Sequence, residues 1–369
     1  MKIALAGTGN VAKRNYIPCL AAQEDVELGY YNRTSAKAEA VAAEFGGEVF
    51  DSLDALAAWD PDSIFVLTRE TDRRDLLSAL LDLNPRRLFC EKPLVAQNGQ
   101  EDVREDDFAA ARDLLQRAKA QGCETAMIFN YRFFDQPLKA KRLIAARDYG
   151  QVNNISGLVH YACWSHAIDL VHHFAGPIVE LTALQGAQVR GEKMAAHDVT
   201  AAFRTAGDAT GTLIGTSMLD WTFPLLELTF NFQGARIHLR DLDGDMEVLD
   251  HRSARHETYA IARDRSRWQQ YDDSFTKSIL AYLETLRQYA PRQYRVSPAC
   301  KSCKSKPPSS APSPPGARST STPIYPWGSK PPPPPPASVR QSPGTPPDRS
   351  PPPSPLPLPG YPRPAPAPP

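Results

Sequence analysis

The sequence contains no long apolar run, and none of its segments approaches the roughly 18 residues that a membrane-spanning helix needs. Its first residues, MKIALAGTGN, also lack the long apolar segment and small-residue cleavage site of a secretory signal. The six cysteines are scattered, and only Cys300 and Cys303 have a motif-like spacing. We therefore expect a cytoplasmic protein that has no membrane segment and keeps its thiols reduced.

A basic surface is also missing from most of the chain. Lys and Arg together number 42, as do Asp and Glu, but residues 299–369 hold eight of the basic residues and one acidic residue. Eight minus one gives the tail a charge of about +7, which leaves the rest of the chain at about −7. A mildly acidic body argues against a nucleic-acid partner.

Proline is scarce before residue 298, whereas 28 of the 36 prolines lie at or after Pro298. Proline has no N–H and fixes φ, so residues 298–369 are predicted to be disordered or to form polyproline II. Such a tail is typical of a linker or an SH3-type ligand, and would then belong to an interaction protein. Its abrupt start after a helix, and its Pro, Ser, Ala, Arg and Gly content, favour instead a GC-rich gene read out of frame.

Strand-like and helix-like segments alternate through the first third of the chain, which predicts βαβ units and a doubly wound parallel sheet. The strands are expected at 2–6, 26–32, 63–67, 87–93 and 124–132, with helices between them. Residues 1–122 are accordingly predicted to form a Rossmann dinucleotide-binding domain.

The pattern changes after about residue 180 to longer alternating runs. These predict antiparallel strands at 210–219, 225–233, 235–241 and 245–250, followed by a helix at 271–290. The expected fold is therefore α/β, with the Rossmann domain followed at 123–297 by an α+β substrate domain built on a mainly antiparallel, open sheet.

A glycine-rich segment follows the first strand and opens a helix. It reads Gly7-Thr8-Gly9-Asn10-Val11-Ala12, a G-x-G-x-x-A motif. The first glycine permits a tight turn, the second lets the backbone approach a pyrophosphate, and Ala12 permits close packing of helix on strand. Residues 7–11 are therefore expected to bind a dinucleotide.

The end of the second strand bears on the choice between NAD and NADP. An acidic residue there would bond the ribose hydroxyls and repel a 2′-phosphate, but this chain has Asn32-Arg33-Thr34. A neutral Asn32, a cation at Arg33 and a hydroxyl at Thr34 favour NADP, although NAD stays an alternative. Arg33 could also be no more than a solvated loop cation.

Glu91-Lys92-Pro93 ends the fourth strand, at the carboxyl edge where open α/β sheets bind ligands. Lys92 is expected there as a point charge that holds a substrate hydroxyl or carbonyl oxygen.

These motifs, together with NYRFF at 130–134, resemble the Gfo/Idh/MocA oxidoreductases over about residues 1–297. The resemblance implies hydride transfer between NAD(P) and a hydroxyl-bearing carbon of a sugar-like or cyclitol-like small molecule. It also implies homo-oligomers through the open sheet face. By the same resemblance, Lys92 is the active-site lysine, and Thr68 and Glu91 contact the cofactor. The implied residues along the cleft are Asn130, Tyr131 and Arg132.

The segment HYACWSHAIDLVHHFAG, residues 160–176, holds four histidines. Ser165 as N-cap and Gly176-Pro177 as stop predict a helix over 166–175. His166 would then lie in its first turn, where the helix dipole disfavours the charged imidazolium and a neutral imidazole can exchange a proton with a hydroxyl.

Three interpretations of this segment stay open. His166 is a catalytic residue; or His166, Asp169 and His173 line one helix face and bind a metal; or these side chains only pair within the domain interface. The resemblance favours the first. A metal is not expected, because the sequence offers no further cluster of ligands. The resemblance also implies an acid four residues before His166, where this chain has Ala162, so Tyr161 or His160 would supply the proton relay.

The missing acid favours an alternative from another class of protein. A regulatory or sensor protein of the same fold would bind NADP with little or no turnover. Lys92 and His166 are both present, and they favour the enzyme.

Overall fold

The computed structural model describes residues 1–191, 194–222, 224–241, 243–261 and 264–289. The predictions for the proline-rich segment 298–369, including its origin in another reading frame and the pair Cys300 and Cys303, lie outside the described residues. Within them, no helix is long and apolar enough to span a bilayer.

The first sheet has six parallel strands in the order β3-β2-β1-β4-β5-β6, the order of a Rossmann fold. They are β1 (Lys2–Ala6), β2 (Glu27–Tyr31), β3 (Glu48–Phe50), β4 (Ser63–Val66), β5 (Arg87–Cys90) and β6 (Glu124–Met127). The sheet thus continues past residue 122, where the sequence placed the end of this domain. Strand β3 and the helix after it were not predicted.

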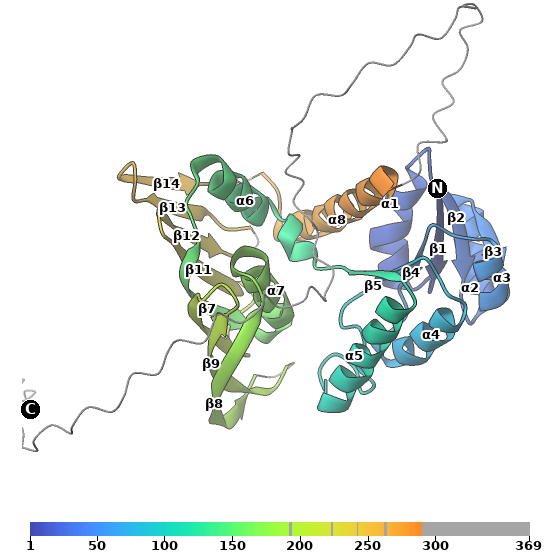
Figure 1. Ribbon diagram of the computed structural model, residues 1–369, viewed down its shortest axis with the longest axis horizontal. Helices are drawn as coiled ribbons and strands as arrows, with labels where there is room; N and C mark the ends of the chain where they lie inside the picture. Colours follow the sequence, from blue (N-terminus) through green and yellow to red (C-terminus); the bar gives the residue numbers. More distant parts are fainter. Residues whose placement is uncertain (192–193, 223, 242, 262–263, 290–369) are drawn as a thin grey trace, which may run out of the picture. The chain divides into compact units, whose positions relative to one another are not determined.

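Helices cover both faces of this sheet (Figure 1). They are η1 (Ala12–Tyr16), α1 (Ile17–Ala21), α2 (Ser35–Phe45), α3 (Leu53–Ala58), α4 (Glu70–Asp82) and α5 (Glu105–Ala120). Alternate residues of β1 enter different cores: Ile3 and Leu5 pack with α1 and α2, whereas Ala4 and Ala6 pack with α3, α4 and α5. Burial on both faces explains why the strands read as continuous apolar runs.

The helix after the glycine-rich loop begins as a π-helix, in which Ile17 N donates to Ala12 O. The wider turn lies directly before Pro18, at the start of α1. Because proline has no N–H and its ring presses on the carbonyl four residues earlier, the wider turn lets the helix continue through this position.

The second sheet has eight strands in the order β14-β13-β12-β11-β7-β10-β9-β8. They are β7 (Val152–His160), β8 (Ile178–Arg190), β9 (Ala196–Thr205), β10 (Thr210–Thr216), β11 (Leu226–Phe232), β12 (Ala235–Arg240), β13 (Met246–Asp250) and β14 (Arg255–Tyr259). All neighbours are antiparallel except β7 and β10, so the predicted mainly antiparallel sheet is confirmed.

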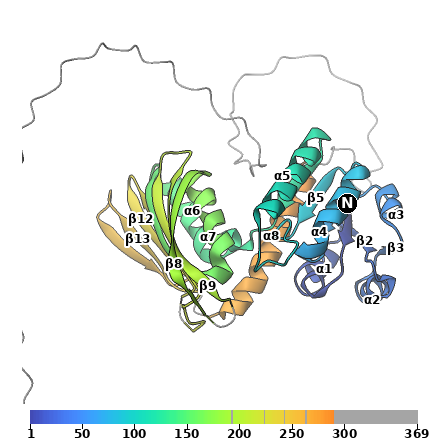
Figure 2. The same cartoon turned by 90° about the horizontal axis from the view of Figure 1, so that it is seen from below.

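One face of the second sheet packs against α6 (Asp135–Arg147) and α7 (Trp164–Ala175), as Figure 2 shows. Core residues alternate along the strands, as in β11, where Leu226, Leu228 and Phe230 are buried. Glu227 and Thr229 lie on the other face. No helix of the described residues covers that face in Figure 2, which we call the open face.

The last described helix, α8 (Arg267–Tyr289), follows the second sheet in sequence but packs into the core of the first. Phe275 contacts Tyr16 edge-on, with ring centroids 5.7 Å apart, and Ile279 and Leu283 are fully buried. Tyr282 bonds Ser63 through their hydroxyls at 2.8 Å. Helix α8 therefore contributes to the nucleotide-binding domain, although the sequence assigned it to the second domain.

Candidate functional site

The glycine-rich loop is closed on its inner side and open on its outer side. Gly7 has φ +105°, and a Cβ on it would lie 2.8 Å from Thr68 N, so this position accepts only glycine. Gly9 is exposed, and a Cβ on it would meet no atom within 4 Å. Asn10 and Val11 are also exposed, so the backbone at 9–11 is open to a phosphate.

Two hydroxyls beside this loop lack hydrogen-bond partners. Thr8 Oγ1 and Thr68 Oγ1 are both buried and unpaired within the described part of the chain. Buried polar groups are normally satisfied, so both hydroxyls are placed to bond a ligand. Together with the open backbone at Gly9, they fit a dinucleotide.

The Asn32-Arg33-Thr34 segment is tied to the glycine-rich loop through Asn32. Its Oδ1 accepts from Thr8 N at 3.2 Å, and its Nδ2 donates to Thr34 O at 3.1 Å. The side chain of Arg33 is 87% exposed and lies 3.9 Å from an Asp72 oxygen. An exposed ion pair of that length is weak, so Arg33 can turn toward a bound phosphate.

The Glu91-Lys92-Pro93 segment follows β5 directly. Tyr16 donates its hydroxyl hydrogen to Glu91 Oε1 at 2.6 Å, and Lys92 N donates to Glu91 Oε2 at 3.1 Å. Burial raises the pKa of the Glu91 carboxyl, while the bond from Tyr16 opposes that shift. The Glu91 side chain is thus bonded inside the protein through both of its oxygens.

Sequence reasoning missed Arg73, whose guanidinium lies behind Lys92. It is 3% exposed and bonds three main-chain carbonyls, those of Thr68, Glu91 and Pro93. A signal was present in the sequence: Arg73 stands at i with buried Leu77 and Leu80 at i+4 and i+7, on the inner face of α4.

His166 lies in the first turn of α7 and is 3% exposed. Its ring is stacked on Tyr131, with centroids 3.7 Å apart and planes 5° apart, and meets the edge of Phe129 at 6.0 Å. Burial lowers the pKa of His166 well below its usual value, and the charge of Lys92 lowers it further. Its Nδ1 is buried and has no partner among the described residues. His166 is therefore neutral near pH 7.

The start of the histidine-rich helix differs from the prediction. The 3-10 turn η3 (Tyr161–Cys163) leads straight into α7 at Trp164, so Ser165 lies inside the helix and its prediction as N-cap was wrong. His160 does the capping one turn earlier, since its Nδ1 accepts from Ala162 N at 3.1 Å. The stop at Gly176, with φ +83°, is as predicted.

The strand predicted over 124–132 ends at Met127, and a 3-10 turn, η2 (Asn130–Phe133), follows it. The turn directs its side chains to different places. Asn130 Nδ2 donates to Ser274 Oγ at 2.9 Å, and Arg132 makes two bonds to Asp169, at 2.6 and 2.5 Å. Of the three residues implied along the cleft, Tyr131 is the one in ring contact with His166.

Two further predictions concern the neighbours of His166. The Tyr161 hydroxyl donates to His197 O at 2.5 Å, so its hydrogen is already used. Asp169, a ligand in the metal interpretation, is held by Arg132 instead. Within the described ranges, no three His, Cys, Asp or Glu side chains gather as metal ligands.

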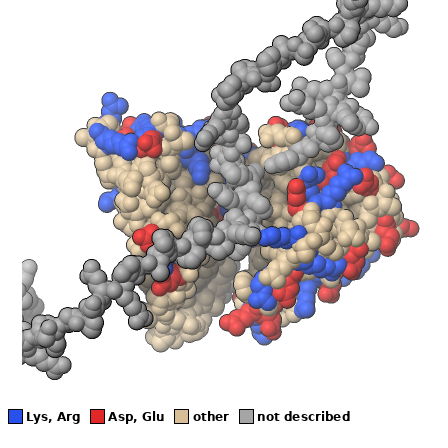
Figure 3. Space-filling model, in the orientation of Figure 1, with Lys and Arg blue, Asp and Glu red and all other residues tan. Residues whose placement is uncertain are grey.

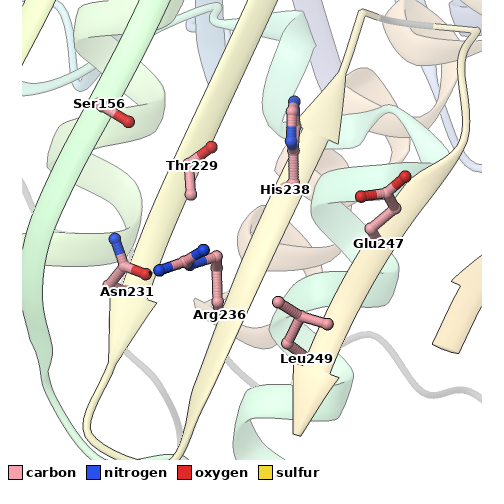
Figure 4. A pocket seen from close by; sticks show the side chains of 7 residues that line it. All are labelled: Ser156, Thr229, Asn231, Arg236, His238, Glu247 and Leu249. Carbon is pink, nitrogen blue, oxygen red and sulfur yellow. Dashed lines mark hydrogen bonds between the residues drawn. The ribbon is translucent and has the colours of Figure 1, made fainter. Parts of the chain in front are cut away.

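A separate cavity of about 380 Å³ lies on the open face of the second sheet (Figure 4). Its lining is mostly polar and consists of Ser156, Thr229, Asn231, Arg236, His238, Glu247 and Leu249. Arg236 Nε donates to Asn231 Oδ1 at 2.6 Å across neighbouring strands. None of the predicted site residues lines this cavity.

On the face drawn in Figure 3, Lys/Arg and Asp/Glu side chains are interspersed over α4 and α5.

Residues 1–129 match a family model described as an oxidoreductase family with an NAD-binding Rossmann fold. Solved structures share the fold over a longer span. A Gfo/Idh/MocA family oxidoreductase from Vibrio cholerae is 14% identical, with a TM-score of 0.59 over 78% of this chain and 90% of that one.

Two other solved structures contain a cofactor. An oxidoreductase from Agrobacterium radiobacter, in complex with NAD⁺, L-tartaric acid and magnesium, is 14% identical, with a TM-score of 0.61 over 78% of this chain and 89% of that one. A 3-ketoreductase from Actinomadura kijaniata, in complex with NADP, is 16% identical, with a TM-score of 0.55 over 80% of this chain and 92% of that one.

The Rossmann strand order, the open glycine-rich loop and the family match define an NAD-binding oxidoreductase. Residues 1–129, which form most of the nucleotide-binding domain, match the model of the Gfo/Idh/MocA family. The resemblance in the sequence motifs is thereby confirmed, as is the predicted two-domain fold.

Proposed function

We propose that this protein transfers hydride between NADP(H) and a hydroxyl or carbonyl carbon of a sugar-like or cyclitol-like molecule. The observation that carries the proposal is the neighbourhood of Lys92 and His166. Lys92 comes from the end of β5 and His166 from α7, yet the lysine is close enough for its charge to lower the pKa of the imidazole. A cation beside a neutral imidazole at the carboxyl edge of the sheet is suited to this chemistry.

In this proposal the two residues divide the work on the substrate oxygen. Lys92 donates a hydrogen bond to that oxygen and stabilises the negative charge that develops on it. During oxidation the hydroxyl proton passes to His166, where the unpartnered Nδ1 can accept it, and the carbon–oxygen double bond forms as hydride leaves the carbon. The bound nicotinamide is the hydride carrier.

We propose NADP as the preferred cofactor, with NAD as the alternative. The end of β2 carries no acid to repel a 2′-phosphate, and the exposed Arg33 can pair with one.

The described cysteines, Cys19, Cys90, Cys123 and Cys163, form no disulfide, which supports a reducing compartment such as the cytoplasm.

The test starts with fluorescence titration by NADPH and NADH. A screen of polyols and sugars then follows absorbance at the nicotinamide band. Oxidation of a member of the screen, lost by about 100-fold or more in Lys92→Ala and His166→Ala, is the expected result. If neither dinucleotide binds, the proposal is wrong.

The second candidate is an NADP-binding regulatory protein without turnover, and Ala162 favours it. The residue stands one turn before His166, where the family implies an acid, and the imidazole Nδ1 there has no partner. Ala162→Asp supplies a carboxylate at this place. For the enzyme we expect it to increase turnover, whereas a regulatory protein would bind NADPH and stay inactive in both forms.

We further propose that two copies associate through the open face. An apolar row crosses four strands of it: Leu158, Ile214 and Leu184 lie in register, with Thr200 between the last two. Ile214 is 40% exposed and Leu184 is 77% exposed. Light scattering on the wild type and on Ile214→Glu tests this. We expect a dimer mass for the wild type and a monomer mass for the variant, and equal masses for the two proteins would contradict the proposal.

A further inference from the structure

A buried cation stands at the carboxyl end of two neighbouring strands, behind the site. Arg73 Nη1 donates to the carbonyl oxygen of Glu91 at 2.6 Å and also to that of Pro93, and Nη2 donates to Thr68 O at 2.6 Å. These partners are all main-chain carbonyls, and a guanidinium keeps its charge even when buried. The position therefore holds three chain segments together: α4, the turn after β4 and the turn after β5.

The bonded carbonyls flank the residue that matters for chemistry. Glu91 and Pro93 are the two neighbours of Lys92, so one guanidinium nitrogen fixes the main chain on both sides of the lysine. Thr68 is the residue whose N would lie 2.8 Å from a Cβ at Gly7. Arg73 thus links the lysine segment to the turn that packs against the glycine-rich loop.

The bonds of Arg73 also matter because the main chain at residues 91–93 is not paired in the sheet. Glu91, Lys92 and Pro93 lie beyond the last ladder pair of β5, which is Val66 with Cys90. Each carbonyl loses its donor if the guanidinium is removed, so we expect the segment to relax. A misplacement of about 1 Å at a reacting group can cost roughly 100-fold in rate.

We propose that Arg73 is a positioning residue. By bridging the turns after β4 and β5, it holds Lys92 at a fixed position relative to the dinucleotide site. The proposal rests on the proposed function for the reaction, but the position of Lys92 can be measured without turnover.

The experiment compares Arg73→Lys and Arg73→Met with Arg117→Lys. Arg117 also bonds a main-chain carbonyl, that of Ser78, together with the side chains of Ser78 and Asp82, but it lies on α5 and bonds only α4 in this way. Each protein is acylated with an amine-reactive reagent below its melting temperature, and mass spectrometry gives the labelling rate of Lys92 relative to the other lysines. The kcat and KM values are measured on the substrate found by the screen.

We expect the relative labelling rate of Lys92 to change by about tenfold or more in Arg73→Lys and Arg73→Met. The kcat should fall by roughly 100-fold with KM within about threefold, while Arg117→Lys resembles the wild type in both. Altered labelling in a protein that turns over no substrate would support the positioning role and reject the proposed function.

Two outcomes would overturn the inference. One is unchanged Lys92 labelling and kcat in a folded Arg73→Lys. The other is that both Arg73 variants are unfolded where Arg117→Lys is folded, which would assign Arg73 to stability alone.

Discussion

The imidazole of His166 lies flat against the phenol ring of Tyr131, with centroids 3.7 Å apart and planes 5° apart. The contact joins α7 to the turn η2 and removes His166 from water. The contact is part of the burial that lowers the pKa of His166.

A first prediction concerns pH and stability. The pKa of His166 is lowered by burial in the folded protein, so the unfolded chain takes up protons first as the pH falls below about 6.5. The contribution of the buried neutral ring is complete above that value and is lost as the pH falls toward the folded-state pKa. We expect the free energy of unfolding to decline on acidification by up to about 1.4 kcal/mol per pH unit from this group.

Urea unfolding between pH 7.5 and 5.0 checks this. His166→Asn should show a shallower decline than the wild type, whereas His256→Asn, at an exposed position, serves as the control. The pKa values of His160, His172 and His173 are also lowered, that of His173 to about 3, so a residual decline stays. Parallel curves for His166→Asn and the wild type would contradict the prediction.

A second prediction separates the two glycines of the loop. Gly9→Ala meets no atom within 4 Å, so stability should stay within about 1 kcal/mol, while the new methyl group blocks the approach of a pyrophosphate. Gly7→Ala forces a residue at φ +105° against Thr68 N and should melt at a lower temperature. Thermal melting and NADPH titration measure both, and a Gly9→Ala protein that binds NADPH normally would disprove this role of the loop.

A third prediction concerns the choice of cofactor. Asn32→Asp keeps an oxygen that accepts from Thr8 N but places a carboxylate where a 2′-phosphate would lie. We expect NADPH affinity to fall by about tenfold or more and NADH affinity to rise. Arg33→Ala should weaken NADPH alone, and Arg112→Ala, an exposed arginine on α5, is the control. Equal changes for both dinucleotides would count against NADP preference.

A fourth prediction concerns the ion pair between Arg132 and Asp169. The carboxylate is 5% exposed and the guanidinium 34%, so Asp169→Asn leaves a partly buried cation without its partner. The cost should be about 2–3 kcal/mol, below the value for a fully buried pair because water reaches Arg132. Glu180→Gln, in an exposed pair with Arg204, should cost no more than about 0.5 kcal/mol. Chemical denaturation measures both, and equal costs would refute the prediction.

Local sequence patterns were sufficient for much of the first domain. The G-x-G-x-x-A motif between a strand and a helix defined the nucleotide loop, because the demands on Gly7 and Gly9 arise within a few residues. In the second domain, the alternation of apolar and polar residues likewise predicted β10 to β13. Side chains along these strands face the core and the open face in turn.

The site needed contacts that no local pattern contains. The sequence predicted that the strand continues through residues 130–132, but the chain forms the turn η2 there. In that turn Asn130 bonds Ser274, 144 residues later. Ser165 is a good N-cap by residue type, but α7 begins at Trp164 because it continues directly from the turn η3, which His160 caps.

The sequence by itself therefore determined the class of fold, the dinucleotide loop and the two candidate residues Lys92 and His166. Only the tertiary structure decided that the His166 ring is buried on Tyr131, that Arg132 pairs with Asp169, and that Arg73 bonds the carbonyls on both sides of Lys92. The reason is physical: periodicity and turn chemistry act over a few residues, whereas burial, which sets pKa values and leaves carbonyls in need of donors, depends on segments far apart in the chain.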